Sequence, residues 1–206
     1  MTRATRGHWM FAALYDALSR CGERAWVGPV RAGLVRDLGG EVLEVGTGTG
    51  LNLPHYRAAS RVVAAEPDPA MRRRLRPRLS EARVPVEVSD AAAEELPFDG
   101  DSFDAVVYTL VLCSVGNLGR ALAEGRRVLK PGGRLVVFEH VRASGRMGTL
   151  QDRADVLWPR IAAGCHLNRD TRTAIERAGF TFEDYETFRR AQSVPLVNPF
   201  IRGVAR

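Results

Sequence analysis

Three alternate glycines follow an apolar run and an acidic residue in the stretch Val42-Leu43-Glu44-Val45-Gly46-Thr47-Gly48-Thr49-Gly50-Leu51-Asn52. Glycine permits positive φ and lets a ligand approach the backbone closely, because no Cβ intervenes. In doubly wound α/β sheets such a turn follows the first strand, and ligands bind outside the carboxyl ends of the strands. The stretch therefore predicts a strand that turns sharply beside a nucleotide-type ligand.

The glycine spacing separates this turn from two phosphate-binding loops. A dinucleotide fingerprint, G-x-G-x-x-G, needs its third glycine where this chain has Leu51. A Walker loop ends in Gly-Lys-Ser/Thr, which this stretch lacks. S-adenosylmethionine has no phosphate, so its site needs close backbone approach and a carboxylate rather than anion donors. The turn favours this ligand, and an NAD-dependent oxidoreductase is kept as a remote alternative.

Alternating segments predict the sheet that would position this turn. Strands are expected at 42–45, 61–65, 85–89, 104–108 and 134–138, of which the first, fourth and fifth are nearly continuous apolar runs. Helices are expected between them, with Asp68 and Asn117 as N-caps. Strand–helix alternation of this kind indicates a parallel sheet built from right-handed crossovers.

The last quarter of the chain changes this pattern. Asp170 begins a helix that Gly179 ends, and residues 180–188 and 200–205 then read as two strands. Only about eleven residues separate these strands, which suits an antiparallel hairpin better than another crossover. The predicted fold is α/β and Rossmann-like: seven strands, five of them parallel and two in a C-terminal antiparallel hairpin, with helices on both faces.

The segment before the sheet predicts helices. Phe11, Leu14, Tyr15 and Leu18 share one face of a helix, and a second helix is expected over 29–38. We expect one domain over residues 1–206, in which 1–40 form a helical cap and 41–206 the sheet and its helices.

Five ordered motifs resemble the class I S-adenosylmethionine-dependent methyltransferases. Glu44–Gly50 matches their acidic-x-Gly-x-Gly-x-Gly signature, and Glu66 and Asp90-Ala91 stand at the next two strand ends. Residues 95–106 and 127–133 resemble the entries to the fourth and fifth strands of the ubiquinone-type branch.

This resemblance implies S-adenosylmethionine as the cofactor and S-adenosylhomocysteine as the product. It places Glu66 on the two ribose hydroxyls, which two carboxylate oxygens can accept from, and Asp90 near the adenine amino group. The implied cofactor-binding residues are Glu44, Gly46, Thr47, Gly48, Gly50, Asn52, Glu66, Pro67, Asp90, Ala91, Thr109 and Leu110.

Residues 109–115, 139–141 and 164–170 are similar to a narrower group, the methyltransferase-like family whose animal members are microsomal alkyl-thiol S-methyltransferases. The likeness covers about residues 40–206 and implies a small hydrophobic thiol as the methyl acceptor. O-, N- or C-methylation of a natural product or a quinone is the alternative. The animal enzymes carry an N-terminal membrane segment, but residues 1–19 are too short and polar to span a bilayer.

Several side chains are candidates for the edge of the sheet where the methyl acceptor would bind. His140, after the fifth strand, is a candidate catalytic base or orienting residue, and His166 is a second candidate although the family fixes no histidine there. Glu139 and Asp152 are further candidates. The candidates for an apolar acceptor pocket are Phe11, Tyr15, Cys113 and Trp158.

Composition narrows the setting and the partners. Cys21, Cys113 and Cys165 are odd in number and follow no metal-binding spacing, so we expect a reduced cytoplasmic protein without a metal site. The net charge of +6 comes almost wholly from arginine, because Lys130 is the only lysine. The densest basic run, 72–78, has no interleaved aromatic residues, so a small molecule rather than a nucleic acid is the expected partner.

Overall fold

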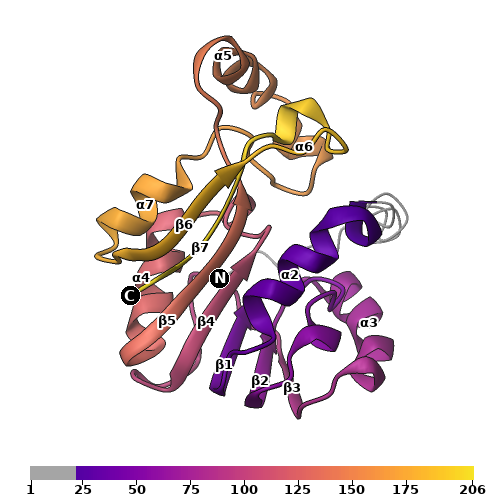
Figure 1. Cartoon of the computed structure of the whole chain (residues 1–206), viewed down its shortest axis with the longest axis vertical. Coiled ribbons are helices and arrows are strands. Elements are labelled where there is room, and N and C mark those ends of the chain that lie inside the picture. The colour runs from indigo at the N-terminus through magenta and orange to yellow at the C-terminus, as the bar shows by residue number, and fades with distance from the viewer. Residues whose placement is uncertain (1–21) are drawn as a thin grey trace. The chain divides into compact units, whose positions relative to one another are not determined.

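A computed structural model describes residues 22–206, which form an α/β protein with a seven-stranded mixed sheet (Figure 1). The strand order is β3-β2-β1-β4-β5-β7-β6. The predicted fold class is therefore confirmed. The predicted helix through Phe11 and Tyr15 lies outside the described residues. The chain divides into two compact units, a first unit that ends at Ala92 and a second unit over Ala93–Arg206. A single domain with a cap over 1–40 stays a prediction.

The first unit carries three parallel strands in which β1 pairs with β2 and β2 with β3. The second half of each of β1 and β2 is buried, which the nearly continuous apolar run at 42–45 predicted for β1. A short π-helix (Glu23–Val27) precedes α2, and α2 spans 28–35 rather than the predicted 29–38. The elements of this unit are α2 (Gly28–Val35), β1 (Gly40–Val45), β2 (Ala59–Ala65), α3 (Pro69–Arg78) and β3 (Val86–Ser89), with single 3-10 turns at Leu53–His55 and Leu79–Glu81.

The second unit pairs β4 with β5 in parallel and then adds the predicted hairpin, since β7 runs antiparallel to both β5 and β6. Helices α5 and α6 lie beyond the carboxyl end of β5 (Figure 1). These two helices were not predicted. The elements are β4 (Phe103–Thr109), α4 (Leu118–Val128), β5 (Leu129–His140), α5 (Gly145–Ala154), α6 (Trp158–Ile161), α7 (Thr171–Arg177), β6 (Phe182–Phe188), a 3-10 turn at Pro195–Val197 and β7 (Phe200–Ala205).

Three helix starts follow the local signals in the sequence. The side chain of Asp68 accepts a hydrogen bond from the amide of Ala70 at 2.7 Å, and that of Asn117 accepts from Arg120 at 3.0 Å. Asp170 accepts from Thr173 in the same way. Each side chain satisfies an amide that has no partner inside the helix, which confirms the predicted N-caps.

Strand β5 begins earlier than predicted. We expected the fifth strand at 134–138, after the 127–133 motif with its turn residues Pro131-Gly132-Gly133, but β5 already starts at Leu129, opposite Phe103. The β4–β5 register shifts between Phe103 and Ala105, and Gly132 has φ of 76°. The turn residues are thus accommodated as an irregularity inside the strand, where the positive φ favours glycine.

Not one helix within residues 22–206 combines the length and the apolar character that crossing a bilayer requires.

Helix α4 packs closely against β4 at Gly125. A Cβ at this position would lie 2.5 Å from the hydroxyl of Tyr108, which donates to the carbonyl of Ala121. We expect Gly125→Ala to lower the free energy of unfolding by about 1–3 kcal/mol, because either the tyrosine or the helix must shift. Urea unfolding measures the effect.

Gly119→Ala on the same helix is the matched control. Its Cβ would meet only Asn117 Oδ1, at 3.7 Å, so stability should be unchanged or slightly higher. Equal stability of the two variants would show that the Tyr108 contact does not limit residue size at position 125.

Candidate active site

The glycine turn after β1 leaves open space beside its backbone. The amides of Gly46 and Thr47 both donate to the carbonyl of Ala65, at 2.8 and 3.1 Å, which fixes the start of the turn. Gly46, Gly48 and Gly50 all have positive φ. A Cβ on Gly48 would meet nothing closer than the Gly46 carbonyl oxygen at 4.0 Å, whereas one on Gly50 would meet Leu53 at 3.2 Å. Gly48 therefore borders free volume, and Gly50 is needed for packing.

The carboxylate of Glu66, directly after β2, is held by two backbone amides. Gly48 donates to Oε2 and Asp68 donates to Oε1, each at 2.8 Å. Burial raises the pKa of Glu66, and these two amides lower it in part. A carboxylate offers about four acceptor positions, so two remain for a ligand. This arrangement fits a vicinal diol such as the ribose of S-adenosylmethionine.

Glu44, at the end of β1, faces an internal polar network. Its Oε2 accepts from the Tyr56 hydroxyl at 2.8 Å and its Oε1 accepts from the Asn52 amide at 3.1 Å. Asn52 in turn accepts from Arg31, which also pairs with Glu23. Burial raises the pKa of Glu44 to about 7, against the opposing effects of Tyr56, Arg31 and Asn52.

The network means that Glu44 and Asn52 hold the glycine turn in place. Both were predicted as cofactor ligands, and direct contact with a cofactor stays a prediction. Arg31 and Tyr56 were missed, because nothing in the local sequence around either one distinguishes a partner of a buried acid from a surface residue.

The remaining predicted cofactor residues of the first unit lie around the same strand ends. The Thr47 hydroxyl donates to the carbonyl of Glu44 at 3.1 Å, and Pro67 is half-buried after Glu66. Asp90 is exposed directly after β3, while the amide of the buried Ala91 donates to the Ser89 hydroxyl. Their roles toward a cofactor stay predictions.

In the second unit, the loop after β4 is anchored by the buried Glu139. Its Oε1 accepts from the amides of Val111 and Leu112, both at 2.8 Å. Burial raises the pKa of Glu139, and these amides oppose the rise. Thr109 is buried at the end of β4, and Leu110 has φ of 56° while its amide donates to the Phe138 carbonyl. A leucine in this region of φ is strained and persists only where its surroundings hold it.

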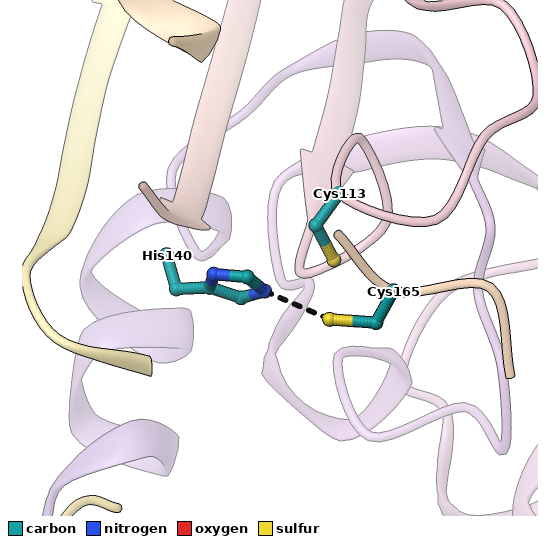
Figure 2. A group of neighbouring side chains, drawn as sticks. All are labelled: Cys113, His140 and Cys165. Atoms are coloured by element: carbon teal, nitrogen blue, oxygen red, sulfur yellow. Dashed lines mark hydrogen bonds between the residues drawn. The ribbon is translucent and has the colours of Figure 1, made fainter. Parts of the chain in front are cut away.

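Cys113, His140 and Cys165 converge in one cluster, with both sulfur atoms and the imidazole turned toward one another (Figure 2). Their ligand-type atoms all lie within 4.8 Å, and His140 Nε2 is 3.1 Å from Cys165 Sγ. Cys113 and His140 are buried and Cys165 is half-buried. We call these three residues the Cys-Cys-His cluster.

Backbone contacts hold this cluster together. The amide of His166 donates to the carbonyl of Cys113 at 2.8 Å. The guanidinium of Arg169 donates to the carbonyls of Leu112 and Val115 on either side of Cys113. The segment that carries Cys165 is thereby fixed to the loop that carries Cys113.

The three side chains of the cluster shift one another's pKa values. The Cys113 thiol lowers the pKa of Cys165, with burial opposing and Trp158 adding to the decrease. The same contact, together with burial, raises the pKa of Cys113. Burial opposes charge on His140, but its interactions with Cys113 and Glu139 prevail and raise its pKa. Cys165 is therefore the more readily ionised thiol.

The predicted acceptor residues separate into two groups. His140 and Cys113 lie in the Cys-Cys-His cluster, and Trp158, at the start of α6, is half-buried next to it. The ring of His166 instead pairs with Asp155, with Nδ1 2.8 Å from Oδ2. Asp152 pairs with Arg142. Phe11 and Tyr15 lie outside the described residues. Cys165 was part of a quoted motif but received no role, since its partners come from distant segments.

The titration of Glu44 makes stability depend on pH. In the folded state Glu44 has a pKa of about 7, whereas the reference pKa of a glutamate is 4.5. Between these two pH values the folded protein therefore binds more protons than the unfolded chain. Stability must therefore fall as pH rises through this window. Relative to Glu44→Gln, we expect the wild type to lose roughly 3 kcal/mol between about pH 5 and 8, measured by urea unfolding.

Glu87→Gln, which changes an exposed carboxylate of the same unit, is the control and should follow the wild-type profile. Parallel profiles for wild type and Glu44→Gln would contradict the burial of a titrating acid at position 44.

Comparisons with known proteins agree with this geometry. Residues 43–137 match the family model described as a methyltransferase domain. The human thiol S-methyltransferase TMT1A is 39% identical over 170 residues, which cover 80% of this chain and 69% of the relative. The rat thiol S-methyltransferase TMT1B is 39% identical over 68% of this chain and 59% of its own length.

Solved structures show the same fold. The methyltransferase in a complex with the Trm112 activator of Haloferax volcanii superimposes with a TM-score of 0.73 at 18% identity and covers 98% of both chains. Fold, family model and extended identity agree. The chain belongs to the class I S-adenosylmethionine-dependent methyltransferases, in the group that contains the TMT1 enzymes.

Proposed function

We propose that this enzyme transfers the methyl group of S-adenosylmethionine to the sulfur of a small apolar thiol. The main support for S-adenosylmethionine as the cofactor is the carboxylate of Glu66, which accepts from the Gly48 amide and lies beside the open space at Gly48. The thiol part rests on the printed names of its relatives, since human TMT1A and rat TMT1B are both thiol S-methyltransferases.

Glu66 and Gly48 would hold the adenosyl part of the cofactor. The bound cofactor supplies an electrophilic methyl group on a sulfonium sulfur. Because the Gly48 and Asp68 amides already orient Glu66, its free acceptor positions need no rearrangement to receive two hydroxyls. Thr47, Pro67, Asp90, Ala91, Thr109 and Leu110 are proposed as further cofactor contacts by resemblance to the family.

The surface around α6 supports an apolar acceptor. Val156, Leu157 and Ile161 are 65–74% exposed, an unusual grouping of large apolar side chains. The amide of Gly164 donates to the carbonyl of Pro159 at 2.8 Å, which ties α6 to the Cys165 segment. An aliphatic acceptor bound on this surface would lie close to the Cys-Cys-His cluster.

A thiol acceptor needs little help from a general base of the protein. A free cysteine thiol has a pKa of about 8.5, and any thiol is far more acidic than the corresponding alcohol, so alignment and exclusion of water contribute most of the rate. A hydroxyl acceptor would require a base. His140 is the candidate base, but its Nε2 contacts Cys165 Sγ. The imidazole is therefore placed to interact with the cysteines of the cluster. The cytoplasmic location expected from cysteine usage stays a prediction.

The acceptor atom is tested with matched compounds. We expect an alkyl thiol to be methylated at least ~10-fold faster than the alcohol and the amine of the same carbon skeleton, because the thiol is far more acidic than the alcohol and forms a strongly nucleophilic thiolate, whereas the amine is mostly protonated at neutral pH. Mass spectrometry of the products locates the new methyl group. Preferred methylation of oxygen, nitrogen or carbon would overturn the thiol assignment and favour a natural-product or quinone acceptor.

The ribose contact is tested at Glu66. We expect Glu66→Ala to weaken S-adenosylhomocysteine binding by ~100-fold or more, since two hydrogen bonds to a charged acceptor are lost. Isothermal titration calorimetry measures the affinity, and circular dichroism checks the fold. Glu87→Ala, which removes an exposed carboxylate from β3, should bind like the wild type. Wild-type affinity in folded Glu66→Ala would make the assignment wrong.

A further inference from the structure

We propose that Cys113, His140 and Cys165 form a binding site for a thiophilic divalent cation of the zinc class, with a fourth coordination position for the acceptor thiolate. The fourth position rests on the proposed function, whereas the cation site rests on the cluster alone. The sequence predicted no metal site, because its cysteines follow no metal-binding spacing. The fold brings together ligands that lie far apart in the sequence. Among residues 22–206, this cluster is the only group of three or more His, Cys, Asp or Glu side chains that could hold a metal ion.

The ligand types and their separations suit zinc. Zinc takes thiolate sulfur at about 2.3 Å and imidazole nitrogen at about 2.0–2.1 Å in a tetrahedral arrangement, which places ligand atoms about 3.5–3.8 Å apart. In the cluster these atoms lie within 4.8 Å of one another, and the Nε2–Sγ separation to Cys165 is 3.1 Å. Side-chain movements of about 1 Å or less would bring these separations to the tetrahedral values.

The scaffold of the site is already in place. Glu139 fixes the loop before Cys113 through the Val111 and Leu112 amides, and Arg169 holds the carbonyls of Leu112 and Val115. The His166 amide joins the Cys165 segment to Cys113. None of these contacts uses a sulfur atom or the imidazole. The three ligands therefore stay available while their backbones are fixed, which favours metal binding.

The charges around the site balance. A divalent cation with two thiolates is neutral overall, so binding with release of two thiol protons leaves no uncompensated charge in this buried place. Arg169 interacts electrostatically with both cysteines and with Glu139, and its charge would offset that of an acceptor thiolate.

Three protein ligands leave one position open, as in catalytic rather than structural zinc sites. Cys165 is half-buried, so an acceptor can reach that side. A coordinated thiol is deprotonated outright, and its proton passes to water. The thiolate sulfur then forms a bond to the methyl carbon, and the carbon–sulfonium bond breaks with its electron pair on the departing S-adenosylhomocysteine. The product is a neutral thioether, a weaker ligand that leaves.

Cobalt substitution tests the cation site independently of activity. The 206-residue chain is treated with a chelator under reducing conditions and titrated with Co²⁺, whose thiolate charge-transfer absorption reports sulfur ligation. We expect one Co²⁺ ion to bind per chain. Cys165→Ser and Cys113→Ser should each lower the affinity by more than ~100-fold, because loss of a residue that only supports a metal ligand already lowers metal affinity by about 10–100-fold. Circular dichroism verifies folding, and Cys165→Ser is the milder change because its side chain is half-buried.

His140→Ala should weaken Co²⁺ binding in the same way, while His55→Gln, an imidazole of the first unit, is the matched control and should leave it unchanged. Absence of thiolate absorption in the folded wild type, or equal binding by wild type and folded Cys165→Ser, would overturn the cation site.

The acceptor position is tested by adding an alkyl thiol and its matching alcohol to the Co²⁺-loaded protein. We expect the thiol alone to change the d–d spectrum, as a fourth ligand would. An unchanged spectrum in a protein that binds Co²⁺ overturns the fourth position. Thiol methylation that persists in chelator-treated protein refutes a role for the cation but leaves the proposed function intact, whereas failure to methylate thiols with the metal bound refutes the proposed function alone.

Discussion

Buried carboxylates at the ends of strands determine how the functional loops of this protein are placed. A buried acid must be compensated by hydrogen bonds, because an unpaired one is costly to remove from water. Glu44, Glu66 and Glu139 each accept two hydrogen bonds, and all of these donors except the Asp68 amide beside Glu66 belong to other segments. The loops that supply those donors are therefore fixed by the strands. Their geometry depends on the sheet more than on their own sequences.

Glu44 and Glu66 show how environment separates two residues of one type. Both stand at the ends of neighbouring parallel strands, β1 and β2. The partners of Glu44 are the side chains Tyr56 and Asn52, whose network extends inward to Arg31. Glu66 is held only by backbone amides, one of them from Gly48, where the space is open. The first acid therefore stabilises the turn, and the second keeps acceptor positions available for a ligand.

Sequence could predict what is local and could not predict what depends on convergence. The N-caps at Asp68, Asn117 and Asp170, the strands and the hairpin all follow from neighbouring residues, and they are confirmed. The two histidine candidates could not be told apart. His166 turns to Asp155, while its neighbour Cys165 meets His140. That choice depends on contacts that span 11 residues for His166 and Asp155 and 25 residues for His140 and Cys165, which no spacing rule reports.

Two adjacent residues at the end of β5 have different roles: Glu139 holds a loop in place, and His140 belongs to the Cys-Cys-His cluster. Side chains alternate across a strand, so Glu139 and His140 point to opposite faces. Glu139 binds the amides of Val111 and Leu112, and His140 contacts Cys165. Because Leu112 directly precedes Cys113, the carboxylate helps to fix the backbone that carries that thiol, while the imidazole contacts Cys165. The geometry of the Cys-Cys-His cluster therefore depends on the strand alternation as much as on the three residues themselves.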